Sequence, residues 1–434
     1  MASFSIPLTG LKADSTALNT VANDLSNMNT TAFKAQTTNF ADLFYQQIGA
    51  TGSGDPIQVG AGVKVATNET DFTQGSISST GNSTDVALDG NGFFVVSNGS
   101  QVYEYTRDGN FTLNSTGGLV TSNGMSVMGY PAVAGVVNTN APLTAISIPV
   151  GQVQQQATTT MSLTANLDSN AAANTQFPAQ VTVYDSLGEP HVATVTFEQT
   201  ATNTWTYTAQ LPSSDYSTAG KDVVPAAVTG TLTFNANGDL ATVAQGAGAA
   251  QTVGTAAGDV SSVALNFNPA ATNVLADGAA GLNIQWNLLS SAGTPTISQV
   301  ATASALSGTS QNGYPSGQYN GFSIGADGTV TVSYLNGQQE NVGQLALANV
   351  ANLQGLALLG NGDYGTTLAS GAAAVGTSGT AGLATMQDSA LEASNVNIST
   401  EFAELIVAQR AFEANAKSVT TFDTVTQDTI NMVH

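Results

Sequence analysis

The sequence predicts a mainly β protein in which β-sandwich or barrel-like domains, one inserted in another, are joined to a stalk of paired terminal helices. Two observations predict this fold class. Residues Ser5–Asn29 and Thr400–Val433 space their apolar side chains as amphipathic, coiled-coil-forming helices do. The long stretch between them, about residues 65–379, consists of short runs separated by Gly turns, which is typical of antiparallel strands.

The N-terminal helix is predicted from its first residues and from one apolar stripe. Ser5 can cap the helix, and Pro7 falls in the first turn, where a missing N–H costs little. Apolar side chains then recur at spacings of three, four and seven, so we expect them to pack against another helix. The stripe consists of Leu11, Leu18, Val21, Leu25 and Met28.

The composition and the turn pattern change twice along the middle of the chain. Asp89-Gly90 and Asn123-Gly124 are typical of hairpin turns, and similar pairs return after Gly313. The block between is rich in Ala, Thr, Asn and Gly. The expected domains are a helical inner core (1–35 and 390–434), an irregular connecting segment (36–74), a shared β-rich domain (75–150 and 314–370), an inserted outer β-rich domain (151–313) and a flexible linker (371–389).

The C-terminal helix has an apolar seam with a heptad spacing, and Ser399 can cap it. The apolar seam residues are Phe402, Leu405, Phe412, Ala416, Val419 and Ile430. Polar residues interrupt the seam, so a helix is predicted more firmly than a coiled coil. This helix is about 50 Å long at 1.5 Å per residue and exceeds the N-terminal helix. We therefore expect its seam to contact neighbouring subunits as well as its own chain.

Composition excludes several classes of function. Charged residues make up 8% of the chain against about 25% in an ordinary domain, and the net charge is −22. Nucleic acids and anionic membranes need a basic surface, which this chain lacks. There are no cysteines, so disulfides and thiolate chemistry are excluded. No apolar run approaches the roughly 18 residues of a membrane span, and no signal peptide is expected.

Two short patterns resemble enzyme motifs, but each has a plainer interpretation. Gly321–Gly325 spells GxSxG around Ser323, yet a hydrolase elbow needs a helix after it, and here an Asp-Gly turn and an alternating strand follow. Gly360–Gly365 spells GxGxxG, but no helix opens after it. We interpret both segments as strands and turns, and predict no catalytic residue and no cofactor.

Metal binding is not predicted either. Asp108 begins a segment like a calcium loop, but the twelfth position is Leu119 rather than Glu. His191 and His434 are far apart in the sequence. We expect His191 to lie at the surface or in a turn.

Four motifs, in order along the whole chain, resemble those of bacterial flagellar rod and hook proteins. The N-terminal motif contains Asn23, Leu25, Asn27, Thr31, Phe33 and Lys34. Two motifs of the β-rich region contain Asp89, Gly90, Gly92 and Phe93, then Arg107, Gly109, Asn110 and Phe111. The C-terminal motif contains Ser394, Asn395 and Val396, followed by Gln409 and Arg410.

The inserted block makes the chain similar to the hook members of this family. Val183–Gly188, with His191 and Trp205 downstream, resembles their extra outer domain, which distal rod proteins lack. Two residues depart from the family pattern. Ala32 stands where the family usually has Gly, the residue that a left-handed turn would favour, and Asp24 stands where a second Asn is common.

The resemblance implies a structural subunit that assembles with itself into a curved, flexible tube outside the cell. That tube would join rod to filament as a universal joint, with the terminal helices innermost and residues 151–313 outermost. The implied partners are a hook cap protein, the distal rod and hook–filament junction proteins, and the flagellar type III export apparatus. Phe40 and Phe44 could contact the export gate, or could serve local packing.

Three other functions stay open at this point. Within the family, the chain could be a distal rod or hook–filament junction subunit. From another class, a secreted β-rich adhesin or surface-layer protein would bind a ligand as a monomer and tolerate loss of its terminal helices. A GxSxG hydrolase would lose activity when Ser323 is replaced by Ala.

Overall fold

The computed structural model describes residues 5–50, 56–99, 102–216, 227–267 and 275–432. The chain divides into two compact units. The first comprises residues 1–150, 320–333 and 339–434, and the second comprises residues 151–319 and 334–338. Lys221, the sole Lys or Arg between Asp108 and Gln409, lies outside the described residues. Among the residues described, no helix has both the length and the apolar character needed to cross a membrane.

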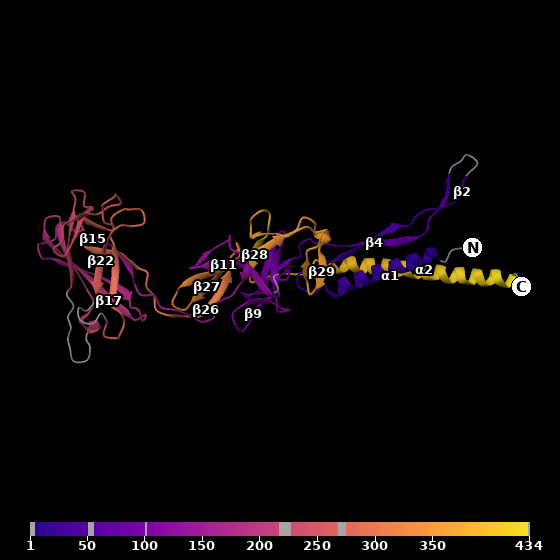
Figure 1. Cartoon of the computed structure of the whole chain (residues 1–434), viewed down its shortest axis with the longest axis horizontal. Coiled ribbons are helices and arrows are strands. Elements are labelled where there is room, and N and C mark those ends of the chain that lie inside the picture. Colours follow the sequence, from indigo (N-terminus) through magenta and orange to yellow (C-terminus); the bar gives the residue numbers. More distant parts are fainter. Residues whose placement is uncertain (1–4, 51–55, 100–101, 217–226, 268–274, 433–434) are drawn as a thin grey trace. The chain divides into compact units, whose positions relative to one another are not determined.

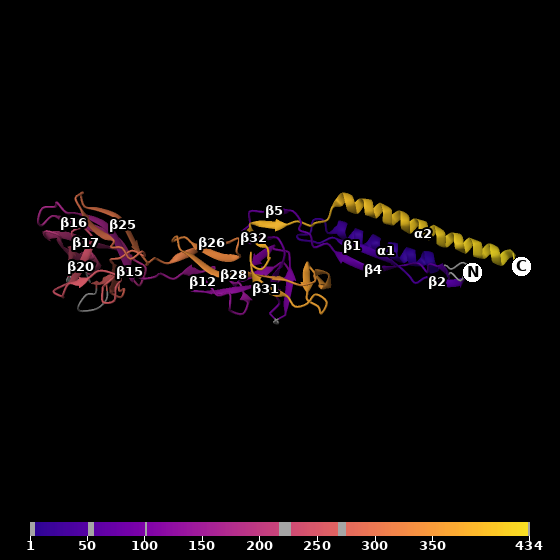
Figure 2. The ribbon, with the colours of Figure 1, turned by 90° about the horizontal axis from the view of Figure 1, so that it is seen from above.

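The two long helices lie side by side in the first unit (Figures 1 and 2). Helix α1 is Ser5–Ser26 and helix α2 is Ile398–Met432. The cap of α2 differs from our expectation, because Asn397 rather than Ser399 accepts the free N–H groups: its Oδ1 lies 3.0 Å from the Ser399 N–H. Asn is as good a cap as Ser, so the helix begins two residues earlier than expected, at Ile398.

Residues 36–74 form paired strands rather than the irregular segment that we expected. Strands β1 (Gln36–Asp42) and β4 (Val63–Thr70) pair antiparallel and pack against α1, as Figure 2 shows, and β2 (Gln46–Ala50) pairs with β3 (Pro56–Val59). The physical reason is that the backbone ladder and polar cross-strand contacts hold this hairpin. The strands lack a buried apolar face, so no alternation marks them in the sequence.

The β-rich body of the first unit has a twisted, largely antiparallel sheet. Its central order is β27-β28-β11-β7-β8-β30-β29. Strand β7 is buried along its whole length, and Phe93 and Val95 contribute to a core with Tyr105, Ala346 and Tyr364. The strands of this body are β5 (Ile77–Ser79), β6 (Val86–Asp89), β7 (Phe93–Ser97), β8 (Tyr103–Thr106), β9 (Phe111–Leu113), β10 (Leu119–Thr121), β11 (Ser126–Val133), β12 (Val136–Val137), β13 (Thr144–Ala145), β26 (Gly317–Ile324), β27 (Thr329–Tyr334), β28 (Gln339–Asn349), β29 (Ala357–Gly360) and β30 (Asp363–Gly365). The chain crosses between the two units within β26 and β27.

Residues 371–389 are ordered strands, where we expected a flexible linker. Strand β31 (Ala374–Thr377) pairs with β28, β32 (Thr385–Asp388) pairs with β6, and β33 (Ala390–Glu392) follows and pairs with β5. The Gly and Ala residues that suggested a linker have small or no side chains, so the sequence shows no alternation of apolar and polar residues by which a strand could be recognised. Backbone pairing with core strands holds the segment instead.

The second unit is a β-sandwich with one core. One sheet has the order β16-β17-β18-β19-β20-β21, and the other has β22-β23-β15-β24 with β25 beside β15. Both contribute to the core, where the Trp286 ring contacts Tyr207 edge-on at 5.3 Å between centroids. The elements are β14 (Gln152–Val153), β15 (Thr160–Asp168), β16 (Gln176–Tyr184), β17 (Pro190–Ala201), β18 (Thr204–Gln210), η1 (Ser213–Tyr216), β19 (Val228–Phe234), β20 (Leu240–Gln245), β21 (Gln251–Thr252), β22 (Ser262–Phe267), β23 (Leu282–Asn287), β24 (Ile297–Val300) and β25 (Ala305–Gln311).

Candidate functional site

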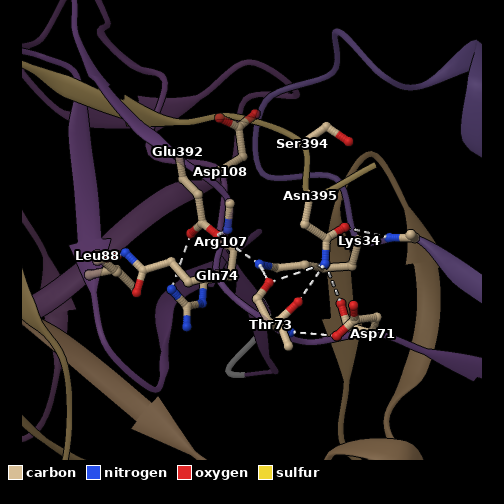
Figure 3. Close-up of polar contacts among 12 residues, drawn as sticks. Lys34, Asp71, Thr73, Gln74, Leu88, Arg107, Asp108, Glu392, Ser394 and Asn395 are labelled. Atoms are coloured by element: carbon tan, nitrogen blue, oxygen red, sulfur yellow. Dashed lines mark hydrogen bonds and ion pairs between the residues drawn. The ribbon is translucent and has the colours of Figure 1, made fainter. Parts of the chain in front are cut away.

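A buried carboxylate joins two buried cations where the terminal helices meet the β-rich body of the first unit (Figure 3). Glu392 is the last residue of β33. Its Oε1 lies 2.6 Å from Lys34 Nζ, in the segment between α1 and β1, and its Oε2 lies 3.1 Å from Arg107 Nη1, just after β8. All three side chains are at most 5% exposed. We call these three residues the junction cluster.

Further hydrogen bonds satisfy the polar atoms of the junction cluster. Lys34 Nζ also donates to the Thr73 carbonyl at 2.7 Å, and the Gly75 N–H donates to Glu392 Oε1 at 2.9 Å. Arg107 Nη2 donates to the Gly90 carbonyl. Burial lowers the pKa of Lys34 and of Arg107, and the Glu392 carboxylate opposes this effect. A single carboxylate therefore keeps two buried cations charged. Replacing Glu392 would leave both cations without a counter-charge, so we expect such a substitution to be costly.

The side-chain amide of Asn395 ties the chain segments around the junction cluster together (Figure 3). Its Oδ1 accepts the Ala35 N–H at 2.8 Å, and its Nδ2 donates to the carbonyls of Asp71 at 2.8 Å and Thr73 at 3.1 Å. It therefore links the entry to β1, the exit from β4 and the approach to α2. A side chain that lost either end of the amide would leave one of these backbone groups without its partner.

Ala32 adopts the left-handed backbone conformation although it is not glycine. Its φ is 54°, and its N–H donates to the Glu392 carbonyl at 2.8 Å. The residue is buried at 5% exposure. The left-handed turn is thus present here with a Cβ, which costs about 1–2 kcal/mol in this conformation.

The face of α1 that is buried lies about one position from the apolar stripe that we predicted. Val21 is buried, whereas Leu11, Leu18 and Leu25 are half-buried and Met28 is 39% exposed. The buried residues of the helix are Pro7, Gly10, Ala13, Thr20, Val21 and Asp24. Small and polar side chains thus face its neighbours more directly than the leucines do.

The contact between α1 and α2 is close and partly polar at its middle. A Cβ on Gly10 would lie 2.7 Å from Asn415 Nδ2, so glycine leaves room for that amide. Asn415 Nδ2 in turn donates to Asp14 Oδ2 at 2.8 Å. Of the predicted α2 seam, four members are half-buried and two, at the ends, are more than half exposed. The half-buried members are Leu405, Phe412, Ala416 and Val419, and the exposed ones are Phe402 and Ile430.

Two buried acidic side chains lie near each other where α1 ends and α2 begins. Asp24 is 0% exposed and Glu401 is 8% exposed. Asp24 Oδ2 accepts the Gln36 N–H at 2.7 Å, but among the described residues Asp24 Oδ1 and Glu401 Oε2 accept no hydrogen bond. Burial, with added repulsion from Glu404, raises the pKa of Asp24 to about 6. Burial, with added repulsion from Asp24 and Glu404, raises the pKa of Glu401 to about 7.

An apolar groove and exposed apolar side chains remain on the helical part of the first unit. The groove, of about 350 Å³, runs between α1, β1 and α2, and Val21, Phe40 and Val407 contribute to its walls. Phe40 is 47% exposed, Val407 is 69% exposed, and Phe44, which follows β1, is 93% exposed. Phe44 therefore does not serve local packing in the isolated chain.

The segments that resemble enzyme motifs have the structures of strands and turns. Ser323 is exposed in β26, and the chain turns directly into β27 instead of entering a helix. Gly360–Gly365 is the tight connection from β29 to β30, with Asn361 at φ 54°. His191 differs from our expectation of a surface or turn residue, because it is 7% exposed on the inward face of β17. Alternation along β17 places it inward with Val195.

Comparison with known proteins places the chain in a family. The hook protein FlgE of Escherichia coli K12 is 36% identical over 445 residues, covering 99% of each chain, and that of Treponema pallidum is 33% identical, covering 98% of each. The chain belongs to the flagellar hook protein family. Family models agree: a flagellar hook protein FlgE/F/G D1 domain matches residues 87–165, a FlaE D2 domain residues 152–314, and a basal body rod FlgEFG C-terminal domain residues 387–432.

A solved hook-family structure shares the fold. The crystal structure of Helicobacter pylori flagellar hook protein FlgE2 superposes with a TM-score of 0.54, covering 71% of this chain and 99% of that one. Sequence identity over that superposition is 14%, so the likeness concerns the fold alone. It agrees with the mainly β architecture that the sequence predicts.

The residues of the four motifs that resemble those of the family fall into two groups in the structure. Lys34, Gly90, Phe93, Arg107 and Asn395 gather at the junction cluster, where the Arg107 guanidinium lies 5.9 Å from the centre of the Phe93 ring. The others are not part of the junction cluster. They are Asn23, Leu25, Asn27, Thr31, Phe33, Asp89, Gly92, Gly109, Asn110, Phe111, Ser394, Val396, Gln409 and Arg410. Gln409 and Arg410 are exposed on α2.

Sequence reasoning missed Glu392, the centre of this site. The one available signal was its position: Glu392 lies two residues before the C-terminal motif, which begins at Ser394, in a chain that has few charged residues. Its partner Lys34 lies 358 residues away, and nothing in one sequence pairs residues at that distance.

Proposed function

We propose that this chain is a structural, non-enzymatic subunit of the bacterial flagellar hook, which assembles with itself into a curved tube. Membership of the hook protein family over the full length supports the proposal. The observation that carries it in the structure is the unburied apolar surface of the helical part. A monomer leaves that surface in water, and a second copy of the chain supplies a surface of the same kind.

The lengths of the two helices indicate where neighbours attach. Helix α1 has 22 residues and α2 has 35, which correspond to about 33 Å and about 52 Å. The last turns of α2 therefore extend past α1, and Val425, Ile430 and Met432 are each more than half exposed. Such a surface is normally covered by a partner. In the tube, these helices form the inner layer, where contacts between subunits are continuous.

The junction cluster suits a subunit that bears load. It fixes β33, from which the chain continues into α2, to the segment after α1 and to the end of β8 through side chains that water does not reach. We infer that torque passes through this point from the helical layer to the outer domains. The tube then acts as a flexible joint between rod and filament.

The proposal places the protein at the flagellar hook, outside the cell. It implies export by the flagellar type III apparatus without signal cleavage, and assembly beneath a hook cap protein, next to distal rod and hook–filament junction proteins. The exposed Phe44 and the partly exposed Phe40 are the candidates for an export-gate contact. We expect Phe44→Ala to lower secretion while leaving the melting temperature unchanged. Undiminished secretion of the Phe40→Ala, Phe44→Ala double variant would remove this part of the proposal.

Assembly is tested with a variant of the exposed face of α2. Phe402 is 52% exposed and Val407 is 69% exposed, so replacing both with Ser should leave the monomer folded. Purified chains are brought to high concentration in ammonium sulfate, which strengthens apolar association, and are followed by light scattering and electron microscopy. We expect tubes from the unmodified chain and monomers from the double variant.

A matched control separates this effect from damage to the helix. Glu413→Gln changes an exposed polar residue in the part of the same helix that lies beside α1, away from its overhanging last turns, and should still form tubes. Tubes from the Phe402→Ser, Val407→Ser variant, with normal length and curvature, would contradict assembly through this face.

A further inference from the structure

Three carboxylates from separate segments of the second unit meet around one histidine. His191 Nδ1 lies 2.8 Å from Asp215 Oδ2, in η1, and His191 Nε2 lies 3.2 Å from Asp185 Oδ2, just after β16. Asp277, in the turn before β23, brings a third carboxylate to the same place. One ligand atom from each of Asp185, His191 and Asp277 lies within 4.8 Å of the other two.

The carboxylate of Asp185 is oriented before any ligand arrives. It is fully buried, and its Oδ1 accepts the N–H groups of Leu187 at 2.8 Å and Glu189 at 2.9 Å. These two bonds close the turn between β16 and β17 and fix the plane of the carboxylate. Its Oδ2 is left to face His191 and Asp277.

The imidazole of His191 is oriented in the same way. Asp215 is held to the chain near Asp277 by its own backbone, since its carbonyl accepts the Ala276 N–H at 2.9 Å. With an N–H on Nδ1 donated to Asp215, the lone pair of Nε2 points at the two remaining carboxylates. A carboxylate behind a ligating histidine is the arrangement that metal sites in proteins use to fix the tautomer and strengthen the ligand.

We propose that Asp185, His191 and Asp277 bind a divalent transition-metal cation, with Asp215 positioning the histidine. One imidazole nitrogen and two carboxylate oxygens form a donor set that suits Zn²⁺. Ligand atoms at about 2.0–2.2 Å from a tetrahedral Zn²⁺ are about 3.3–3.6 Å apart. The three atoms of this cluster lie within 4.8 Å of one another, so binding draws them together by up to about 1.5 Å, a movement that the exposed Asp277 can make. Asp277 is exposed, which gives the cation a path from solvent and leaves room for a water ligand.

The bound cation would fasten three surface segments of the outer unit. The β16–β17 turn, η1 and the turn at Asp277 each contribute one or two of the four side chains. The segments already touch through a hydrogen bond from the Ala280 N–H to Ser186 Oγ at 3.1 Å. Because the cation binds the folded unit and not the unfolded chain, its presence raises the stability of this unit in proportion to the logarithm of its concentration.

The test is a calorimetric titration of the full chain, without a histidine tag and freed of metal by a chelator, with ZnCl₂. Millimolar MgCl₂ and NaCl suppress loose binding by a chain of net charge −22. We expect one saturable site per chain. Asp277→Asn should weaken its affinity by about tenfold or more, because it removes one ligand from an exposed position.

Asp259→Asn is the matched control, since Asp259 also accepts a backbone N–H in a turn of the same unit but lies outside the cluster. It should bind Zn²⁺ as the unmodified chain does. Tryptophan fluorescence, which reports this unit, verifies that each variant is folded and should show Zn²⁺ raising the unfolding midpoint less in Asp277→Asn than in the other two proteins. Absence of a saturable site, or equal affinity in the Asp277→Asn variant, would overturn the proposal.

Discussion

At Glu392 one carboxylate holds two cations away from water. We predict that Glu392→Gln lowers the free energy of unfolding of the first unit by about 3–5 kcal/mol, because Lys34 and Arg107 would stay buried without a counter-charge. The measurement is urea unfolding followed by circular dichroism at 222 nm. Glu413→Gln, an exposed residue of α2, is the control and should change little. A loss below about 1 kcal/mol at Glu392 would show that the cluster relaxes or admits water.

Ala32 offers the opposite case, a residue whose replacement should stabilise the fold. A Cβ at φ 54° is strained, and glycine relieves that strain at a smaller entropic cost. We predict that Ala32→Gly raises the free energy of unfolding by about 0.5–1 kcal/mol. Ala372→Gly, at an exposed position of the same unit without a positive φ, should instead leave it unchanged or lower it. Equal losses in both variants in urea unfolding would mean that the methyl group of Ala32 contributes packing that outweighs its strain.

At the scale of elements, the start of the helix pair is sensitive to pH. The pKa of Asp24 is about 6 and that of Glu401 about 7, both above the ordinary 3.8 and 4.5 because burial disfavours the ionised forms. Below about pH 3 both groups are protonated in the folded and unfolded chains. As pH rises from about 3 to above 7, the unfolded chain ionises them more readily, so the free energy of unfolding falls.

We predict that the double variant Asp24→Asn, Glu401→Gln removes this pH dependence. At pH 8 it should be more stable than the unmodified chain by at least about 1 kcal/mol, because the amides carry no buried charge. At about pH 3 the two proteins should have similar melting temperatures by circular dichroism. Asp423→Asn, exposed on α2, is the control for general effects of charge. A double variant that is less stable than the unmodified chain at pH 8 would contradict the prediction.

The elements also show which parts of the fold the sequence could predict. Apolar spacing predicted both terminal helices, and Asn-Gly and Asp-Gly turns predicted the β-rich middle. The buried face of α1 was displaced by one position, because Gly10 and Ala13 allow close approach, and a scale of hydrophobicity ranks such residues below leucine. Strands β1 and β4 were missed since they bury no apolar face, and β31 because its pairing with β28 is a backbone interaction.

The candidate sites divide in a similar way. Motif residues such as Lys34, Arg107 and Asn395 were found because the resemblance named them. Glu392 and the Asp185–His191–Asp277 cluster were not, because each brings together residues far apart in the sequence. Periodicity describes a residue's own element and carries no information on its distant partners.

At the scale of the whole molecule, the chain has two units that each bury a core of their own. The two tryptophans of the chain, Trp205 and Trp286, are both fully buried in the core of the second unit. Both long helices belong to the first. Tryptophan fluorescence therefore reports unfolding of the second unit, and circular dichroism at 222 nm reports mainly the first, so the stabilities of the units can be measured separately in one protein.

We predict that core substitutions in one unit leave the other unit's transition unchanged. Leu265 is 0% exposed in the second core, so Leu265→Ala should lower the stability measured by fluorescence by about 2–5 kcal/mol through loss of apolar contacts and the cavity left behind. Its dichroism midpoint should stay in place. Glu392→Gln should lower the dichroism midpoint and leave the fluorescence midpoint in place, and so serves as the matched control. If either variant shifts both midpoints equally, the units unfold as one cooperative body, and the mechanical independence expected of an outer domain on a bending tube would fail with it.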